Sequence, residues 1–338
     1  MTVTDLLGVM DGGRPLTFLR TVDRSLLHRE ALSEVFLTDS VGLDERRYLG
    51  AAQLPSSHAY YTDHVGHRAV DPMLLLECCR QAETFGGHAH MGIDTDRKFI
   101  LQSWSMRLPG LFSAIADGRA AELTMSVQTN RQAGSDVPVR ALTYDITMST
   151  VGGHVGDVQI AVGYLSSAAY AGFRSRRRGS RPPLSDEICT VSSTVGPTFV
   201  GRSNPANVLL AEIAVDAAEL TAVVRPVFEN CSMFDHPQDH LPGMVLTEAA
   251  LQACLIAGRQ WYGDGAETHS VVAFDLAFSA FAELDLATTV KVRPLGWPTG
   301  GDRRFAVSFH QDGATVVEGE MSTAEVPMPL RARSGPSS

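Results

Sequence analysis

Residues 63–81, DHVGHRAVDPMLLLECCRQ, have a second version at residues 235–252, DHPQDHLPGMVLTEAALQ. Both stretches begin with Asp-His and end in an apolar helical pattern that carries one glutamate and, four residues later, a glutamine. Three pairs of equivalent residues keep nearly the same spacing, at 173, 172 and 171 residues: Arg29 and Arg202, Asp63 and Asp235, Glu77 and Glu248. A near-constant spacing over separate landmarks indicates two copies of one unit of roughly 170 residues.

The overall composition is typical of a folded protein with two domains. The 338 residues are 44% apolar and 20% charged, which provides enough apolar material for two cores. The net charge of −10 argues against general binding to nucleic acid. No apolar run reaches about 18 residues, the length that spans a bilayer, and the first residues lack the pattern of a secretory signal. We therefore expect a cytoplasmic protein that binds neither membrane nor nucleic acid.

The cysteines and paired histidines predict neither disulfides nor a metal site. The five cysteines form no CxxC pair and most lie in apolar stretches, so we expect buried free thiols. His236 with His240, and His88 with His90, have spacings found in metal sites. Neither pair comes with a recognisable third ligand, so we do not expect a bound metal.

Each copy is predicted to contain one long helix and about six strands. In the first copy Asp71 and Pro72 are typical of a helix start, and Gly86 with Gly87 predicts an end near residue 85. The second helix is predicted at 242–262. Short runs rich in β-branched and aromatic residues predict the strands, at 32–39, 57–62, 98–107, 120–129, 138–149 and 156–167, then at 206–213, 219–228, 270–280, 287–294, 303–310 and 314–322.

The two predicted helices are apolar on nearly every side, as MLLLECC and MVLTEAALQACLIAG show. Such a helix is surrounded by other elements rather than laid on a surface. One central helix with about six antiparallel strands, present twice, predicts an α+β tandem hot-dog fold in which a curved sheet wraps each helix. We assign residues 1–168 to the first repeat with its lead-in, 169–194 to an Arg/Pro-rich linker, 195–326 to the second repeat and 327–338 to a flexible tail. The arginine run at 174–181 is interpreted as a solvated part of the linker.

Each helix carries one glutamate within an apolar run. Glu77 is the only charged residue of the run 72–79, and Glu248 is the only one of the run 244–258. A carboxylate there is costly unless it is hydrogen-bonded or faces a cavity. Burial would raise its pKa and make it a candidate general acid or base. The alternative, a merely structural ion pair with a neighbouring arginine, is weakened because the pattern occurs in both copies.

A histidine precedes each glutamate at a similar distance. His64 lies 13 residues before the glutamate of its copy, and His236 lies 12 residues before its own. An imidazole titrates near neutral pH, so both are candidates for proton transfer, although each could instead fix a turn. The aspartates immediately before them, Asp63 and Asp235, either orient the imidazole or hold the turn.

Polar side chains accompany the first glutamate on its helix. Arg80 and Gln81 follow Glu77 by three and four residues and share its helix face. Arg80 either holds a phosphate bidentately or neutralises Glu77. The second copy retains the glutamine as Gln252 but has Leu251 at the position of Arg80, so the two copies are not equivalent.

Two further arginines, Arg29 and Arg202, recur before strand-like runs. Each either binds a phosphate or covers a sheet edge, and we favour the sheet edge. Both remain candidate substrate-binding residues, and the full set of these is Arg80, Gln81, Gln252, Arg29, Arg202, Asp63 and Asp235.

With these residues placed, the sequence resembles the AfsA-type family of A-factor biosynthesis, the γ-butyrolactone or butenolide synthases of actinobacterial signalling. Four segments carry the resemblance: HREALSEVFLTD (28–39), DPMLLLECCRQA (71–82), VGRSNPANVLL (200–210) and DHPQDHLPGMVLTEAALQAC (235–254). The family tends to have arginine in the second helix as well, so Leu251 is a departure. This departure puts the phosphate contact of the second copy in doubt.

A more distant similarity suggests how the two copies combine. LPGMVLTEAALQ is similar to the helix of hot-dog acyl-carrier-protein dehydratases, whose sites take a histidine from one protomer and a helix acid from the other. Applied to this chain, the similarity pairs His64 with Glu248 and His236 with Glu77. Because Arg80 lies beside Glu77, we predict that the site with His236 is the more active one.

The family resemblance implies a reaction. A β-ketoacyl group would pass from acyl-carrier protein, or an acyl-CoA thioester, to a hydroxyl of dihydroxyacetone phosphate, and the ester would close to a butenolide phosphate. A histidine would take the hydroxyl proton, a glutamate would orient the nucleophile or help in the later condensation, and Arg80 would hold the phosphate. Unpaired N–H groups at a helix N-terminus would hold the thioester oxygen. No metal or redox cofactor is implied beyond the phosphopantetheine that carries the acyl group.

Two other functions stay open from the residues alone. A hot-dog hydratase, dehydratase or thioesterase would use the same His/Glu pairs on an acyl thioester. A regulator without catalytic activity would only bind an acyl chain or lactone. The arginine beside the first acid favours a phosphorylated co-substrate. The sequence leaves open whether the chain forms a homodimer.

Overall fold

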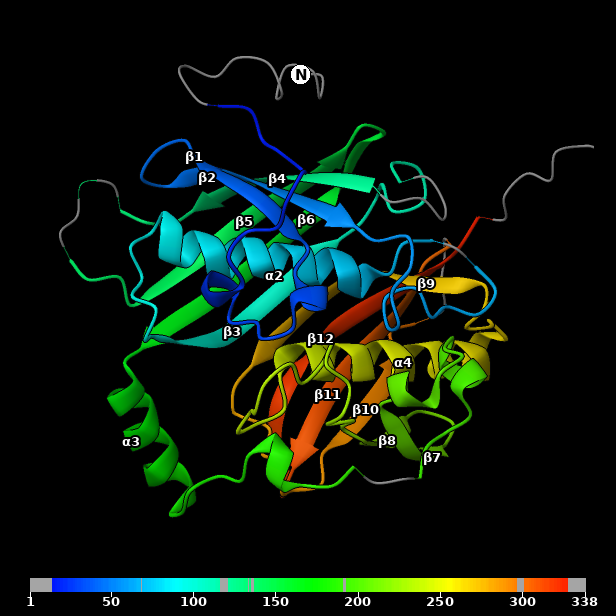
Figure 1. Ribbon diagram of the computed structural model, residues 1–338. Helices are drawn as coiled ribbons and strands as arrows, with labels where there is room; N and C mark the ends of the chain where they lie inside the picture. The colour runs from blue at the N-terminus through cyan, green and yellow to red at the C-terminus, as the bar shows by residue number, and fades with distance from the viewer. Residues whose placement is uncertain are drawn as a thin grey trace, which may run out of the picture.

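The computed structural model describes residues 14–67, 69–115, 121–132, 134, 137–190, 193–296 and 301–327. Two copies of one α+β unit follow each other in the chain (Figure 1). In the first copy a curved sheet wraps the helix α2 (Pro72–Ala89), and its strands are β1 (Leu37–Gly42), β2 (Arg47–Leu54), β3 (Lys98–Arg107), β4 (Ala121–Thr129), β5 (Ala141–Thr150) and β6 (Gly153–Leu165). In the second copy the helix is α4 (Gly243–Tyr262), and the strands are β7 (Leu210–Val215), β8 (Leu220–Val224), β9 (His269–Phe278), β10 (Thr289–Pro294), β11 (Arg303–Gln311) and β12 (Ala314–Glu325).

The twelve strands form one continuous antiparallel sheet. Its order is β1-β2-β4-β5-β6-β3-β9-β12-β11-β10-β8-β7, so the copies join where β3 pairs with β9. Within that junction Ser105 lies opposite Asp275. Helices α2 and α4 lie on the same face of the sheet and contact each other (Figure 1). The predicted tandem hot-dog fold is confirmed, and the sheets of its two copies are continuous.

The helix α2 begins where the sequence predicts but ends later. The Asp71 carboxylate caps it by accepting the Met73 N–H at 2.8 Å. The predicted end near residue 85 is wrong, because the helix continues through Gly86 and Gly87 to Ala89. At Gly86 a side chain would overlap the ring of Tyr48 on β2. This glycine therefore serves a close approach between helix and sheet rather than a helix end.

The first two predicted strands differ from the observed ones. Residues 57–62 form a turn rather than a strand, and the strand lies earlier, at β2. β2 contains Gly50, Ala51 and Ala52, which have low strand propensity. Small residues are needed there because the sheet approaches α2 closely, and Gly50 lies against Ala82 of that helix. The remaining strands lie within a few residues of the predicted ranges.

The segment between the copies contains the helix α3 (Ser167–Arg178), capped by Ser166. The interpretation of the arginine run as a solvated linker is wrong for its first member, because the side chain of Arg174 is 2% exposed. Residues 1–13 of the lead-in and 328–338 of the predicted flexible tail lie outside the described residues.

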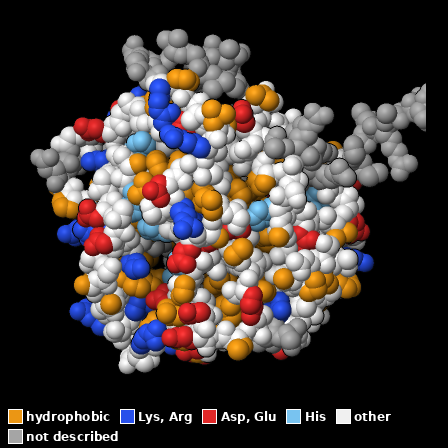
Figure 2. Space-filling model, viewed as in Figure 1, with side chains coloured by type: hydrophobic (Ala, Val, Ile, Leu, Met, Phe, Trp, Pro, Cys, Tyr) orange, Lys and Arg blue, Asp and Glu red, His pale blue; other side chains and the backbone are white. Residues whose placement is uncertain are grey.

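The surface side chains, the helices and the cysteines show no membrane-spanning helix and no disulfide among the described residues. On the face shown in Figure 2, basic and acidic side chains are interspersed among hydrophobic ones. Within the described ranges, no helix has the length and apolar character needed to cross a bilayer. All five cysteines are unpaired; Cys78, Cys79 and Cys254 are buried, whereas Cys189 and Cys231 are exposed.

Candidate active site

Glu77 lies at the centre of a buried cluster on α2. Its Oε1 accepts hydrogen bonds from Arg29 Nη2 at 2.6 Å, Arg80 Nη2 at 2.7 Å and Gln81 Nε2 at 2.7 Å. A second bond runs from Arg80 Nε to Glu77 Oε2 at 2.7 Å. Arg80 and Gln81 contact the carboxylate because residues three and four positions apart share one helix face, as predicted. Arg29 reaches it from the segment before β1, a contact across 48 residues of sequence.

The charge of Glu77 is fixed by these arginines. Burial alone would raise its pKa, but the positive charges of Arg29 and Arg80 hold the pKa of Glu77 at about 2. The sequence-based prediction of a raised pKa is therefore wrong for this residue. A carboxylate that stays ionised near neutral pH cannot act as a general acid, and it is a weak base. Its evident task is to position two guanidinium groups.

These guanidinium groups face a cavity of about 640 Å³ between the two copies. Arg29 and Arg80 line it from the first copy, and the Arg80 side chain is 22% exposed. Another part of the wall is apolar, and it is formed by Leu101, Trp104, Ile160, Val162, Leu246 and Phe278. The cavity thus offers a cationic region and an apolar region within one space.

The N-terminus of α4 opens onto the same cavity. Pro242, Gly243 and Met244 line it, and the cap residue Pro242 makes no side-chain hydrogen bond to the helix. The first N–H groups of a helix lack partners within the helix, and the helix dipole makes this end positive. A side chain at Gly243 would overlap Leu101 and Trp104 of β3, so glycine lets the helix begin against the other copy. This uncapped helix start is able to bind a carbonyl oxygen on which negative charge develops.

His236 reaches the cavity from the loop before α4. Its Nε2 lies 2.6 Å from Gln238 Nε2. An amide nitrogen only donates, so Nε2 accepts and the ring proton is assigned to Nδ1. Nδ1 lies 3.6 Å from Asp235 Oδ2, and the side chain is 33% exposed. The structure thus brings His236 and Arg80 to one cavity, with the lone pair of His236 Nε2 accepting from the Gln238 amide.

The second cluster, around Glu248 on α4, is closed. Arg202 Nη2 donates to Glu248 Oε1 at 2.8 Å, and Arg202 Nη1 lies 3.1 Å from Asp71 Oδ2. His64 Nε2 lies 3.2 Å from the same Asp71 oxygen. The Arg202 guanidinium also stacks over the ring of Tyr60, with 4.6 Å to its centroid. Among the described residues that line the cavity, none belongs to this second cluster.

The two acids of the closed cluster ionise differently. Burial raises the pKa of Glu248, and the neighbouring Asp71 carboxylate raises it further, although Arg202 opposes both. This direction agrees with the sequence-based prediction. Burial would also raise the pKa of Asp71, but Arg202 and His64 hold it at about 2. One guanidinium is shared by two buried carboxyl groups, and Glu248 Oε2 has no hydrogen-bond partner among the described residues.

The arginines Arg29 and Arg202 do not cover a sheet edge, so the role favoured from the sequence is wrong. Each instead pairs with the helix glutamate of its own copy, Glu77 or Glu248. The physical reason is that a carboxylate within an apolar interior needs a counter-charge, and both arginines supply one. Only Arg29 keeps access to the cavity.

The aspartates of the repeated Asp-His pairs hold loops of the opposite copy. Asp63 accepts backbone N–H groups of Ser203 and Asn204 at 3.2 and 3.0 Å. Asp235 accepts those of Glu30 and Ala31, the latter at 2.7 Å. Each loop follows the arginine of its copy, so the aspartates fix where Arg29 and Arg202 lie. Asp235 additionally lies near His236, as described above.

The helix glutamines are fully buried and tie each helix to the start of the first strand of its copy, β1 or β7. Gln81 Oε1 accepts the N–H groups of Phe36 and Leu37, at 2.9 and 3.1 Å. Gln252 Oε1 accepts that of Leu209 at 2.9 Å. Each amide also donates to the glutamate of its own helix at 2.7 Å. The glutamines therefore position the acids from within the protein.

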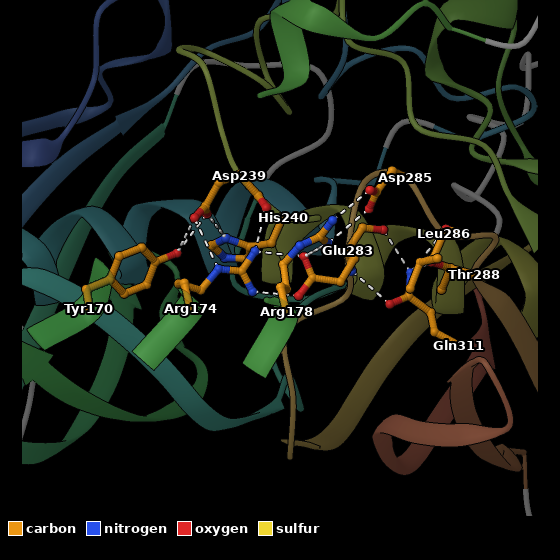
Figure 3. A network of polar contacts seen from close by, with 10 residues as sticks. All are labelled: Tyr170, Arg174, Arg178, Asp239, His240, Glu283, Asp285, Leu286, Thr288 and Gln311. Atoms are coloured by element: carbon orange, nitrogen blue, oxygen red, sulfur yellow. Dashed lines mark hydrogen bonds and ion pairs between the residues drawn. The ribbon is translucent and has the colours of Figure 1, made fainter. Parts of the chain in front are cut away.

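The helix α3 holds the loop that carries His236 and His240. Figure 3 shows Tyr170 and Arg174 directed at Asp239 of this loop, with Tyr170 Oη donating to Asp239 Oδ1 at 2.7 Å. Arg174 also forms two bonds to Glu283, at 2.7 and 2.8 Å. Because Tyr170 and Asp239 line the cavity, this network fixes one side of its wall. The sequence showed only an arginine-rich run, without the acidic partners from the second copy.

Two cavity residues were missed by the sequence analysis. His28 lies 2.9 Å from His88, between their Nε2 atoms, and burial together with the charges of His88 and Arg80 lowers its pKa to about 4. Glu83, three residues after Arg80, is 3% exposed and lines the cavity. His28 has no counterpart in the second copy, which has Gly201 there. A signal for Glu83 existed, since it is a second acid within the helix pattern that begins at Asp71.

Comparison with known proteins shows the family of this chain. The AfsA family, described as the A-factor biosynthesis hotdog domain, matches residues 10–165 and 185–327. The chain belongs to the AfsA family. A 2-oxo-3-(phosphooxy)propyl 3-oxoalkanoate synthase of Streptomyces virginiae is 31% identical over 304 residues, covering 88% of this AfsA-family chain and 95% of that protein. A synthase of the same name from Streptomyces coelicolor is 25% identical, with coverages of 87% and 89%.

Solved structures agree in fold with this AfsA-family protein. A trans-AT PKS dehydratase domain from Brevibacillus brevis matches with a TM-score of 0.50 and 15% identity, covering 83% of this chain and 94% of that chain. At this identity the similarity shows the fold alone.

Proposed function

We propose that this protein passes a 3-oxoacyl group from a thioester to a hydroxyl of dihydroxyacetone phosphate. The product would be a 2-oxo-3-(phosphooxy)propyl 3-oxoalkanoate, the ester that gives the relatives their name. This ester leads to a butenolide phosphate, a precursor of γ-butyrolactone-type signals. The observation that carries the proposal is the Arg29–Glu77–Arg80 cluster, which faces a cavity that also contains an uncapped helix start.

The cationic region fits the phosphate of the acceptor. Two guanidinium groups share the single carboxylate of Glu77, so the cluster keeps a net positive charge at the cavity wall. Guanidinium groups bind phosphate oxygens bidentately and thereby orient the molecule that carries them. Arg80 keeps the exposure that such a contact needs.

The α4 start and the apolar wall fit the acyl thioester. The thioester oxygen would lie at the N–H groups of Gly243 and Met244, where negative charge that develops during attack is stabilised. The acyl chain would lie along the apolar wall, which includes Leu101 and Val162. The thioester would be carried on the phosphopantetheine arm of an acyl-carrier protein or of CoA.

His236 supplies the proton acceptor in this proposal. The acceptor hydroxyl replaces the Gln238 N–H at its Nε2, which takes the proton as the hydroxyl attacks the thioester carbonyl. The imidazolium that forms lies near Asp235. The tetrahedral intermediate then loses the thiolate, which takes the proton from His236 and leaves as a thiol. Charge and protons balance over the cycle, and the imidazole returns to its starting form.

We place this chemistry at the cavity and give the second cluster a structural role. The first site has an uncapped helix start, Arg80 and His236 around a cavity. The second has Asp71 as the helix cap, Leu251 in place of Arg80, and Arg202 buried between two acids. A cytoplasmic location also suits the five free cysteines, since cytosolic thiols are kept reduced.

A single assay separates this function from its alternatives. The protein is incubated with a 3-oxoacyl thioester, with and without dihydroxyacetone phosphate, and released thiol is measured. Release that depends on the phosphate compound supports the synthase. Release without it supports a thioesterase, loss of water or its addition without release supports a hydratase or dehydratase, and tight binding without reaction supports a regulator.

A further inference from the structure

His240 is a cavity residue that the transfer chemistry leaves unused. It lies in the loop between His236 and α4, and it lines the cavity. Its Nδ1 lies 2.7 Å from Asp239 Oδ1. An ionised carboxylate only accepts, so the ring proton is assigned to Nδ1, and Nε2 keeps a lone pair in the neutral ring. Among the described residues, Nε2 has no hydrogen-bond partner.

The carboxylate of Asp239, which orients this ring, is itself held by α3 (Figure 3). Tyr170 Oη donates to its two oxygens at 2.7 and 2.8 Å, and Arg174 Nε donates to Oδ2 at 3.2 Å. Burial would raise the pKa of Asp239, but hydrogen bonds from His240 and Tyr170 and the charge of Arg174 hold it well below its usual range. The carboxylate is therefore ionised near neutral pH, and it keeps the ring proton of His240 on Nδ1.

The ring of His240 is accessible from the cavity. Its side chain is 26% exposed, and Nε2 itself is not buried, in contrast to the unpaired Nδ1 of His236. Phe281, which also lines the cavity, packs against the ring with 4.7 Å between the ring centroids. His236 Nε2 is taken by the Gln238 amide, whereas a ligand reaches His240 Nε2 without displacing a protein group.

The position of His240 along the cavity follows from the exposure of the lining residues. Thr95 and Lys98 line an exposed part of the cavity, whereas Trp104 and Leu246 line a part in which the side chains are almost completely buried. His240 has an exposure between these extremes. A carrier that stays at the surface and inserts its acyl group into the buried part therefore passes residues of this intermediate class.

A pantetheine thioester has one N–H group close to its sulfur. Two methylene groups follow the sulfur, and then comes an amide nitrogen whose N–H needs an acceptor once it leaves water. In the proposed function the thioester oxygen lies at the Gly243 N–H, three residues after His240, and three residues of chain span at most about 10 Å. His240 Nε2 thus offers an acceptor within reach of this amide, and the Phe281 ring offers an apolar surface to the methylene groups.

We propose that His240 recognises the acyl donor, with Nε2 accepting the N–H of the pantetheine amide nearest to the sulfur. The inference rests on the proposed function and divides its tasks among three side chains. His236 exchanges the proton, Arg80 holds the phosphate of the acceptor, and His240 holds the arm that delivers the acyl group. The helix α3 gains a role as well, because through Asp239 it sets which nitrogen of His240 accepts.

The test compares two probes that differ in one N–H group. Both are unreactive thioether analogues of a 3-oxoacyl thioester, one made from N-acetylcysteamine and one from 2-acetoxyethanethiol, in which an ester oxygen replaces the amide N–H. Dissociation constants are measured by NMR titration. We expect the wild type to bind the amide probe roughly 3- to 10-fold more tightly, the effect of one neutral hydrogen bond.

Two variants of His240 locate the acceptor. His240→Phe keeps a ring beside Phe281 but lacks the nitrogen, so the preference for the amide probe should disappear. His240→Gln has an amide oxygen that accepts, so part of the preference should return. His154→Phe is the matched control and should keep the full preference, because His154 also lies near an aspartate, Asp157, at 3.1 Å, but is 45% exposed on β6 and does not line the cavity.

Four outcomes are decisive. Equal affinity of the wild type for the two probes overturns the inference, and so does a preference that persists in folded His240→Phe, checked by its melting temperature. In the thiol-release assay, a loss of roughly 100-fold or more in His240→Phe with amide and ester thioesters alike would show that His240 exchanges a proton, which overturns its assignment to recognition. Absence of phosphate-dependent thiol release in the wild type instead contradicts the proposed function, and the titrations do not depend on that release.

Discussion

Arg202 Nη1 of the second repeat lies 3.1 Å from Asp71 Oδ2 of the first repeat, and both side chains are almost completely buried. Asp71 caps α2, and Pro242, the equivalent residue 171 positions later, begins α4 without a side-chain cap. The ion pair therefore closes the start of α2 at the second cluster. The start of α4 instead opens onto the cavity. A single substitution at the repeated position changes what the N-terminus of the helix is able to bind.

This ion pair predicts a large effect on stability. Arg202→Met would leave Asp71 and Glu248 buried without a counter-charge, so we expect a loss of about 3–5 kcal/mol in the free energy of unfolding. Urea denaturation measures it. Arg293→Met, whose side chain is 63% exposed, is the matched control and should change stability by less than about 0.5 kcal/mol. Full stability with lost activity in Arg202→Met would mean that the second cluster is catalytic.

The two histidines should differ in activity. His236→Ala removes the proton acceptor of the open cavity, so we expect kcat for transfer to dihydroxyacetone phosphate to fall by roughly 10²- to 10⁴-fold. His64→Ala should be much milder, since His64 lies in the closed cluster beside Asp71. Both variants are assayed by thiol release under the same conditions. The assignment of the active site is reversed if His64→Ala is the more damaging change.

Arg80→Leu would give the first helix the residue found at position 251 of the second. Loss of a charge-assisted contact to phosphate costs about 1.5–3 kcal/mol, which corresponds to a rise in KM for dihydroxyacetone phosphate of roughly 10- to 100-fold. The KM for the acyl thioester should change far less. The measurement is steady-state kinetics with each substrate varied in turn. Equal changes in both KM values would argue against phosphate binding by Arg80.

Glu77→Gln should lower kcat/KM by roughly 100-fold or more, as expected for a charge that orients two arginines. Because the pKa of Glu77 is about 2, the residue is ionised throughout the neutral range. The variant should therefore keep the wild-type shape of the pH–rate profile between about pH 5 and 8. Glu248→Gln, in the closed cluster, should lose less activity. A missing limb in the Glu77→Gln profile would show instead that Glu77 exchanges a proton during turnover.

Glu83 predicts a pH-dependent stability. Its pKa rises from 4.5 in the unfolded chain to about 7 in the folded protein. The contribution of Glu83 to the free energy of unfolding is thus fully present below pH 4.5. It is lost as the pH rises through about 7, the pKa in the folded protein. Glu83→Gln lacks this loss, so its stability relative to wild type should increase by about 3 kcal/mol between pH 4 and pH 8. Melting temperatures at both pH values test it, and a constant difference would contradict the raised pKa.

Part of the site follows from helix geometry and was predictable. Arg80 and Gln81 must lie beside Glu77, because the α-helical repeat places residues three and four apart on one face. The contact from Arg29 was not predictable, since it joins residues 48 apart. This contact also reverses the expected effect of burial on the pKa of Glu77. Local spacing shows which residues share a helix face, but a pKa depends on every charge that the fold brings near.

The fold itself was determined by local patterns in the sequence. Strand and helix periods, turn residues and the repeated Asp-His motif occur twice at a near-constant spacing, and each pattern acts over a few residues. Only the tertiary structure decided which copy keeps an open site. That outcome depends on Arg202 filling one cluster and on α3 holding Asp239 at the wall of the cavity. These relations join residues from different elements, and burial and charge act through space rather than along the chain.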